Sequence, residues 1–136
     1  MKRREIADTL ATVPLFSRCT TADLRTVARH LEVVDIDPGT TLITEGDEGE
    51  TFYLILDGEV EVSRDGEVVG MAQSGAHFGE LALLDPAPRA ATVVTKSDCR
   101  VGILSVRMFR VIVRELPTVS FGLLGALAGQ LREAME

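Results

Sequence analysis

Short β-branched runs separated by glycine turns fill residues 33–75 and constrain the fold more than any other feature of the chain. Two of the turns are Asp-Gly pairs, Asp57-Gly58 and Asp65-Gly66, flanked by alternating strands such as Val60/Val62 and Val68. An Asp-Gly pair between alternating strands is the strongest short-range signal for a β-hairpin. Many short strands at this spacing predict an antiparallel roll or barrel. We expect a further pair of strands at residues 89–95 and 99–105.

The N-terminal part of the chain follows a helical period instead. Thr20, with Asp23 three residues later, matches a capping box at the start of a helix. Apolar residues then recur at the spacing i, i+3, i+4, i+7, which marks one face of a helix. The residues of this face are Leu24, Val27, Ala28 and Leu31.

The C-terminal part predicts two helices, which Pro117 separates. In the second helix an apolar stripe lies opposite three glycines, and each glycine destabilises a helix by roughly 1 kcal/mol relative to alanine. This helix therefore needs a partner surface, which is the barrel or a second chain; a helix whose position depends on ligand is the alternative. The stripe is Leu124, Leu127, Leu131 and Met135, and the glycines are Gly122, Gly125 and Gly129.

These patterns predict an α+β chain that is mainly β. We expect an antiparallel β-roll, a jelly-roll-like barrel, with an N-terminal helical segment before it and a C-terminal helix pair after it. A length of 136 residues suits one domain over 1–136. Within it we expect the helical segment at about 8–32, the roll at about 33–104 and the C-terminal helices at about 105–136.

Charge and composition argue against several classes of protein. Residues 31–70 hold twelve acidic residues and one cation, Arg64. Nucleic-acid binding needs a basic footprint, so we expect none. No run approaches the ~20 apolar residues of a membrane span, and no signal-peptide pattern follows the basic start. Cys19 and Cys99 lack the spacing of metal ligands, so we expect no zinc site and a cytoplasmic protein with free thiols.

The stretch HFGELALLDPAPRAATVV, residues 77–94, places one glutamate and one arginine among small and apolar residues. We expect a short helix here between two strands, beginning at Gly79-Glu80. A helix N-terminus presents unpaired N–H groups to anions, and glycine lets a ligand approach the backbone closely. Arg89 comes from the far end of the loop and can bind two phosphate oxygens. The amides of Ala90 and Ala91 can donate as well.

Glu80 is expected to avoid a phosphate and to accept a hydrogen bond from a neutral hydroxyl, such as a ribose 2′-OH. The arrangement therefore suits a compact molecule with one phosphate anion and one sugar hydroxyl. The simpler alternatives are that Glu80 caps the short helix and that Arg89 is a surface residue.

At these residues the sequence resembles the cyclic nucleotide-binding domains of cAMP-dependent protein kinase regulatory subunits, of the bacterial catabolite activator protein and of cyclic-nucleotide-gated channels. Residues 78–93, FGELALLDPAPRAATV, are similar to the phosphate-binding cassette of that family, and the resemblance extends over about 13–116. It implies a binding module rather than an enzyme, with cAMP or, less favoured, cGMP as the ligand and no further cofactor. Ala90 stands where a threonine favours cGMP in the kinase relatives, which favours cAMP.

The resemblance also implies a role for individual residues. Glu80 accepts from the ribose 2′-OH, Arg89 pairs with the cyclic phosphate, and Thr92 lies close to the base. Val69 and Gly70 line the pocket wall, and no residue is expected to be catalytic or to bind a metal. The full set of expected ligand-binding residues is Gly79, Glu80, Leu81, Ala82, Arg89, Ala90, Ala91, Thr92, Val69 and Gly70.

A sensing module must act through other groups. We expect the ligand to shift the terminal helices and so to control an unknown effector protein, and a homodimer through the last helix is consistent with its apolar stripe. The alternative is an interaction or scaffold domain that keeps the fold without binding nucleotide. A cupin-type enzyme is a third hypothesis, which the two isolated histidines argue against. We expect His77 to be peripheral and the EGDEGE segment, residues 45–50, to be a solvated acidic turn rather than a calcium loop.

Overall fold

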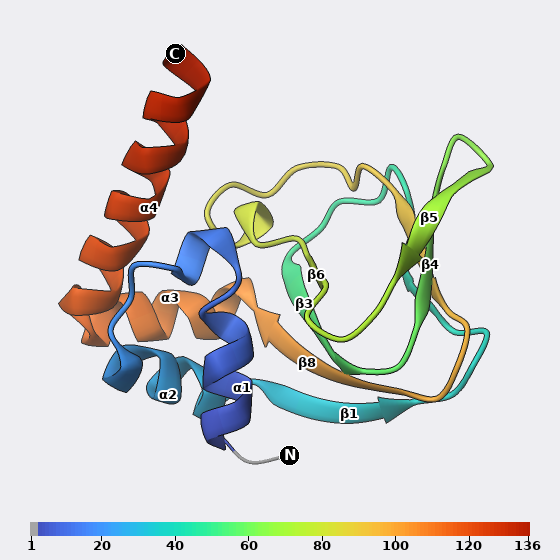
Figure 1. Cartoon of the computed structure of the whole chain (residues 1–136), viewed down its shortest axis with the longest axis horizontal. Coiled ribbons are helices and arrows are strands. Elements are labelled where there is room, and N and C mark those ends of the chain that lie inside the picture. Colours follow the sequence, from blue (N-terminus) through green and yellow to red (C-terminus); the bar gives the residue numbers. More distant parts are fainter. Residues whose placement is uncertain (1–2) are drawn as a thin grey trace. The chain divides into compact units, whose positions relative to one another are not determined.

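The computed structural model describes residues 3–136, which form two compact units (Figure 1). One unit comprises residues 32–106 and contains the strands; the other combines residues 3–31 with 107–136 and is helical. The predicted fold class is confirmed: the chain is mainly β, with an antiparallel roll that helices precede and follow.

The β unit consists of two antiparallel sheets of four strands each. Their orders are β1-β8-β3-β6 and β2-β7-β4-β5, so most strands pair with partners that are distant in sequence. The strands are β1 (Glu32–Ile36), β2 (Thr41–Ile43), β3 (Thr51–Asp57), β4 (Val60–Arg64), β5 (Glu67–Ala72), β6 (His77–Phe78), β7 (Thr92–Thr95) and β8 (Cys99–Ser105).

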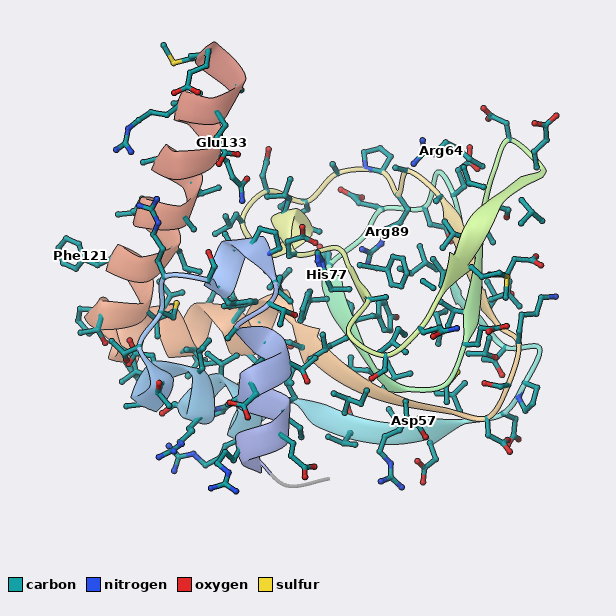
Figure 2. The ribbon with its side chains drawn as sticks, in the orientation of Figure 1. Asp57, Arg64, His77, Arg89, Phe121 and Glu133 are labelled. Carbon is teal, nitrogen blue, oxygen red and sulfur yellow. The ribbon has the colours of Figure 1, made fainter. Side chains whose placement is uncertain are left out.

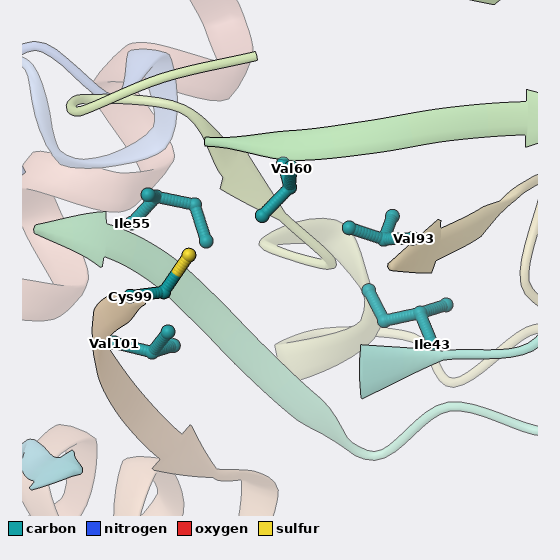
Figure 3. Packing of buried hydrophobic residues seen from close by; sticks show 6 residues of the cluster. All are labelled: Ile43, Ile55, Val60, Val93, Cys99 and Val101. Atoms are coloured by element: carbon teal, nitrogen blue, oxygen red, sulfur yellow. The ribbon is translucent and has the colours of Figure 1, made fainter. Parts of the chain in front are cut away.

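Small branched side chains from both sheets form the core of the roll (Figure 3). The chain has no tryptophan and few other aromatic residues, so valine and isoleucine fill this space. Burying each such side chain contributes about 1.5–3 kcal/mol to folding. One sheet supplies Ile43, Val60 and Val93, and the other supplies Ile55, Cys99 and Val101.

The hairpin predicted at Asp65-Gly66 is confirmed. It joins β4 to β5, with Arg64 opposite Glu67. The φ angles of Asp65 and Gly66 are 53° and 79°. Positive φ at both central residues is the requirement of the type I′ turn, whose twist matches that of the flanking strands.

The hairpin predicted at Asp57-Gly58 is wrong. β3 pairs with β6 and β8, whereas β4 pairs with β5 and β7, so the turn carries the chain from one sheet to the other. Gly58 has a φ of 105°, and an added Cβ would meet the main chain of Asp98 and Cys99. A left-handed glycine serves either kind of connection, so the residue pair does not specify the partner strand. The expected strand pair at 89–105 likewise divides, as β7 and β8, between the two sheets.

The helical unit contains α1 (Arg3–Leu10), η1 (Pro14–Phe16), α2 (Thr21–His30), α3 (Val106–Glu115) and α4 (Pro117–Met135). α1 begins earlier than the expected start near residue 8, because Ile6, Ala7 and Leu10 give it a buried face. The break at Pro117 is confirmed, and α3 and α4 meet there at 110°. Within residues 3–136 no single helix has the length and apolar character to cross a bilayer. Only the bent pair of α3 and α4, taken as one segment, is long and apolar enough.

The first turn of α2 carries half of the predicted capping box. Thr20 Oγ1 accepts from the Asp23 N–H at 3.1 Å. The Asp23 carboxylate accepts instead from the Thr118 hydroxyl at 2.9 Å, which joins α2 to the start of α4. The predicted apolar face of α2 is buried, which confirms it.

α4 packs within this unit through its glycines. An added Cβ at Gly122 would lie 2.8 Å from Cys19 Sγ and 3.0 Å from Cys19 Cα, and Gly125 and Gly129 lie against Arg18. Glycine therefore lets the helix approach the segment that follows η1 more closely than any other residue would.

The apolar stripe of α4 is not core. Phe121 and Met135 are 76% and 77% exposed, and Leu124 and Leu131 are each 62% exposed. Figure 2 shows Phe121 projecting away from its helix. Leu127, which was expected in the stripe, is only partly exposed.

Candidate functional site

One cavity of about 450 Å³ in the β unit collects most of the residues expected to bind ligand. Apolar side chains of Ile43, Val62 and Val93 line part of it, and the segment from His77 to Ala91 supplies most of the rest. Of the expected residues, the cavity is lined by Gly79, Glu80, Leu81, Ala82, Arg89, Ala90 and Ala91.

The first half of the cassette is a tight turn rather than a helix of one to two turns. Gly79, with a φ of 84°, leads from β6 into the 3-10 turn η2 (Leu81–Leu83). The Ala82 N–H donates to the Gly79 carbonyl at 3.1 Å. Ala82 and Leu83 are buried, so the turn is anchored on the roll while Leu81 stays exposed.

The second half of the cassette is bonded through its main chain to the loop between β2 and β3. The Gly46 N–H donates to the Arg89 carbonyl at 2.9 Å, and the Arg89 N–H donates to the Asp47 carbonyl at 2.8 Å. The Gly49 N–H donates to the Ala87 carbonyl at 3.3 Å. These bonds fix the backbone of Arg89. Sequence reasoning missed them, since main-chain bonds leave no side-chain signal.

The Arg89 side chain points inward from the cassette (Figure 2). Its Nη2 donates to the Thr51 carbonyl at 2.7 Å, and its Cζ lies 6.0 Å from the centre of the Tyr53 ring. A Cβ on Gly49 or on Gly79 would overlap the guanidinium. The arginine is therefore held in a slot between two glycines, of which only Gly79 was expected at the site.

The half-buried Arg89 cation forms no ion pair with a carboxylate within residues 3–136. A buried charge is normally paired, and guanidinium is the side chain best suited to a two-oxygen anion. The N–H groups of Ala90 and Ala91 donate to no main-chain acceptor in the part of the chain that the structure describes. This end of the cavity therefore offers several donors to an anion.

Glu80 does not cap the short helix, which removes that alternative. Its Oε2 lies 3.1 Å from Nδ1 of His77, and both side chains line the cavity, with 23% and 25% of their surfaces exposed. The hydrogen bond from His77 lowers the pKa of Glu80 against the opposing effect of burial. His77 was expected to be peripheral. Its spacing of three residues from Glu80 was the one feature of the sequence that could have indicated the contact.

A second arginine lines the cavity. Arg64, at the end of β4, donates from Nε to the Ala90 carbonyl at 3.2 Å. The neighbouring Asp65 N–H donates to the Glu45 carboxylate at 2.9 Å. Sequence reasoning placed Arg64 only in a hairpin, because its contact with the cassette depends on the pairing of β4 with β7, which are distant in sequence.

Three expected residues do not line the cavity. Thr92 Oγ1 accepts from the Glu45 N–H at 3.0 Å, so its oxygen ties the β2–β3 loop to β7. Val69 and Gly70 lie on β5, and Val69 is 60% exposed. β4 lies between β5 and β7 and supplies the wall through Val62 and Arg64, so a contact of Val69 or Gly70 with a ligand stays a prediction.

The acidic loop at 45–50 presents the side chains of Asp47, Glu48 and Glu50 to solvent. Within residues 3–136 no three histidine, cysteine, aspartate or glutamate side chains are grouped so that they could hold a metal ion.

A family model described as the cyclic nucleotide-binding domain matches residues 33–115. The chain belongs to this family. The match contains the roll except for the first residue of β1, together with the cassette and the cavity, so the resemblance predicted from the cassette is confirmed.

Curated members of the cyclic nucleotide-binding domain family with similar sequences include two fungal proteins. A cAMP-dependent protein kinase regulatory subunit from Pyricularia oryzae is 41% identical over 111 residues, which are 80% of this chain and 28% of the relative. The same kind of subunit from Mycosarcoma maydis is 38% identical over 135 residues, which are 93% of this chain and 24% of the relative. The chain thus spans about a quarter of the length of these relatives.

Solved structures give the same fold. The N-terminal domain of a transcriptional regulator from Streptomyces coelicolor has a TM-score of 0.86 at 27% identity, covering 93% of this chain and 94% of that one. The regulatory domain of Toxoplasma gondii PKA, solved with cAMP, has a TM-score of 0.72 at 39% identity, covering 81% of this chain and 44% of that one.

Proposed function

We propose that this cyclic nucleotide-binding domain binds cAMP, with cGMP as a weaker ligand, and that it acts as a regulatory module without catalytic activity. The observation that carries the proposal is the inward-pointing Arg89 guanidinium, which has no carboxylate partner in residues 3–136 and lines the same cavity as Glu80. The cavity pairs a donor for a phosphate with an acceptor for a hydroxyl.

Each part of the ligand has an assigned partner in this proposal. Arg89 and the N–H groups of Ala90 and Ala91 bind the cyclic phosphate. Glu80 accepts from the ribose 2′-OH through its carboxylate, and the main chain of Gly79, Leu81 and Ala82 completes the sugar and phosphate contacts. A contact of Thr92 with the base stays a prediction. A contact of Val69 or Gly70 with the ligand also stays a prediction. Neither residue lines the cavity, so the ligand would have to extend beyond the lining to reach them.

The relatives support the choice of cAMP. The curated proteins are regulatory subunits of a cAMP-dependent kinase, and two of the solved relatives, from Toxoplasma gondii and the protein PfPKA-R, hold cAMP. Ala90 follows the arginine in this chain. An alanine at that place offers no hydroxyl to the exocyclic groups of guanine.

The regulatory part of the proposal is that ligand binding shifts the terminal helices and thereby controls an effector protein, in a cytoplasmic setting. A ligand moves such an equilibrium only through its different affinities for the two arrangements. Charge-assisted hydrogen bonds contribute about 1.5–3 kcal/mol each, so a few that form in one arrangement alone would suffice.

We propose in addition that α4 forms a homodimer with a second copy of the chain. Its exposed apolar residues, together with Ala128, follow a spacing of three and four residues along the helix. This is the a and d pattern of a coiled-coil seam, which needs an equivalent helix as its partner. The seam consists of Phe121, Leu124, Ala128, Leu131 and Met135.

Isothermal titration with cAMP, cGMP and 5′-AMP tests the ligand. We expect cAMP to bind more tightly than cGMP, and 5′-AMP to bind weakly because its phosphate is not cyclic. Arg89→Leu should weaken cAMP binding by about 2–5 kcal/mol, since it leaves the phosphate without its cation.

Arg100→Leu is the matched control, because Arg100 is an exposed arginine paired with Asp35 and does not line the cavity. It should bind cAMP as the wild type does. Absence of heat and of any thermal shift with all three nucleotides would instead support the scaffold alternative. Unchanged affinity in Arg89→Leu would remove the assigned role of this residue.

A further inference from the structure

We propose that His77 couples ligand binding to proton uptake, so that the domain holds its anionic ligand more tightly as the pH falls. The inference rests on the proposed function of the same cavity. It concerns a positioning residue that the cassette pattern does not include.

The position of His77 is fixed from two sides. Its backbone belongs to β6, where His77 lies opposite Leu54 of β3. Its ring nitrogen Nδ1 lies 3.1 Å from the Glu80 carboxylate. The imidazole is about three-quarters buried, so it cannot turn away from the cavity without breaking this contact.

The cavity is balanced in charge when His77 is neutral. Its other charged lining residues are two arginines, Arg64 and Arg89, and two carboxylates, Glu80 and Asp85. On β3, Leu54 lies opposite His77, whereas Tyr53 lies opposite Phe78 with its ring beneath the Arg89 guanidinium. Among the types of side chain in this lining, histidine is the one whose ordinary pKa places its change of charge between about pH 5 and 8.

Glu80 in particular stays ionised through this range, because the hydrogen bond from His77 lowers the pKa of its carboxyl group. Protonation of His77 therefore changes the lining from neutral to a net charge of +1. The ligand carries one negative charge on its phosphodiester at every pH in this range, so the attraction increases only on the protein side. By linkage, ligand binding must then favour the protonated imidazole to the same extent.

The same contact orients the carboxylate. A carboxylate has two oxygens and several lone pairs, and His77 engages only Oε2. Oε1 is left for the ligand hydroxyl, and a charged imidazolium holds the pair more firmly than a neutral ring. Proton uptake and sugar recognition are thus served by one side chain.

The test is titration of the whole chain with cAMP from about pH 8 to about pH 5.5. We expect the wild-type affinity to rise by about three- to tenfold over this interval, with fractional proton uptake on binding. The uptake is read from the dependence of the binding heat on the ionisation enthalpy of the buffer. His77→Gln keeps a hydrogen-bond donor for Glu80 but cannot gain charge, so its affinity should not depend on pH.

His30→Gln is the matched control, because the chain has two histidines and His30 is exposed on α2. It should retain the wild-type pH dependence. A wild-type chain that binds cAMP with the same affinity at every pH, or a His77→Gln variant that keeps the wild-type slope, overturns the inference and leaves the proposed function standing. Absence of cAMP binding at every pH overturns the proposed function and the inference with it. The measurement of proton uptake in different buffers uses only the wild-type chain, so it tests the inference even if His77→Gln fails to fold.

Discussion

At the scale of single residues, Arg89 depends on neighbours that carry no functional group. Its guanidinium lies between Gly49 and Gly79 and bonds the carbonyl of Thr51. Gly79 has a left-handed φ of 84°, so a side chain there is strained for two reasons. Gly49 is not among the residues with positive φ, so a side chain there is excluded only by the arginine.

Gly49→Ala should therefore weaken cAMP binding about tenfold without touching the ligand, because the new methyl group displaces the Arg89 guanidinium from its slot. Calorimetric titration measures the loss. Gly70→Ala is the control: an added Cβ there meets nothing within 4 Å. If Gly70→Ala weakened binding and Gly49→Ala did not, the sequence-based assignment of Gly70 to the site would be preferred over the slot.

Local residue patterns could point to the candidate site, because Gly79, Glu80 and Arg89 belong to one continuous stretch of the sequence. The partners that hold them were not predictable in this way. Gly49 and Thr51 reach the arginine only after β3 and the cassette have been brought together by the sheets. His77 lay inside the stretch, but its spacing to Glu80 does not by itself show which way an imidazole points.

At the scale of elements, α4 is placed by close backbone contact as well as by its buried apolar side chains, Val119, Leu123 and Ala126. Gly122 lies against Cys19, whose pKa is raised to about 11, mainly by burial and further by the charge of Asp23. The thiol is therefore neutral at physiological pH and serves as a small apolar packing surface for the helix. This contact replaces the barrel or second chain that the sequence suggested as partner for the glycines.

Gly122→Ala and Gly125→Ala should change stability in opposite directions. The methyl group at Gly122 would overlap Cys19 and cost about 1–3 kcal/mol, more than the roughly 1 kcal/mol that alanine contributes to a helix. At Gly125 the nearest atom is the flexible Arg18 side chain at 3.4 Å, so the alanine should be neutral or stabilising. Urea unfolding of the two variants measures the difference. If the two substitutions changed the free energy of unfolding equally, helix propensity alone would determine their effect, and the contact with Cys19 would have none.

The elements themselves were largely predictable, and their pairing was not. Period and capping residues located α2 and the break at Pro117, and Asp65-Gly66 located the β4–β5 hairpin. Asp57-Gly58 has the same local signal but joins different sheets. Which strand lies beside another is decided by how the two apolar faces close over a common core, and this information is spread over the whole roll.

At the scale of the whole molecule, the exposed seam on α4 predicts the oligomeric state. We expect the wild-type chain to sediment as a dimer at micromolar concentrations, since a two-helix seam removes its apolar side chains from water. Leu124→Glu combined with Leu131→Glu should sediment as a monomer, because four like charges would face one another in the seam. Sedimentation velocity measures both.

Val68→Glu is the control for this prediction. Val68 is 61% exposed on β5, so the substitution places a glutamate at an exposed apolar position in another part of the chain. It should leave the dimer intact. A wild-type chain that stays monomeric at every concentration would contradict the proposed seam.

The main-chain bonds between the cassette and the β2–β3 loop have an evolutionary consequence. Because carbonyl and amide groups make the contact, the carboxylates of Asp47 and Glu48 are not part of it and project into solvent. Mutation can replace these acidic side chains, and with them the local surface seen by other proteins, while the arginine keeps its place. Positions 46 and 49 are the exceptions, the first for its left-handed backbone and the second for its missing side chain. Variation in this loop can therefore diversify the surface around an unchanged pocket at little cost in ligand affinity.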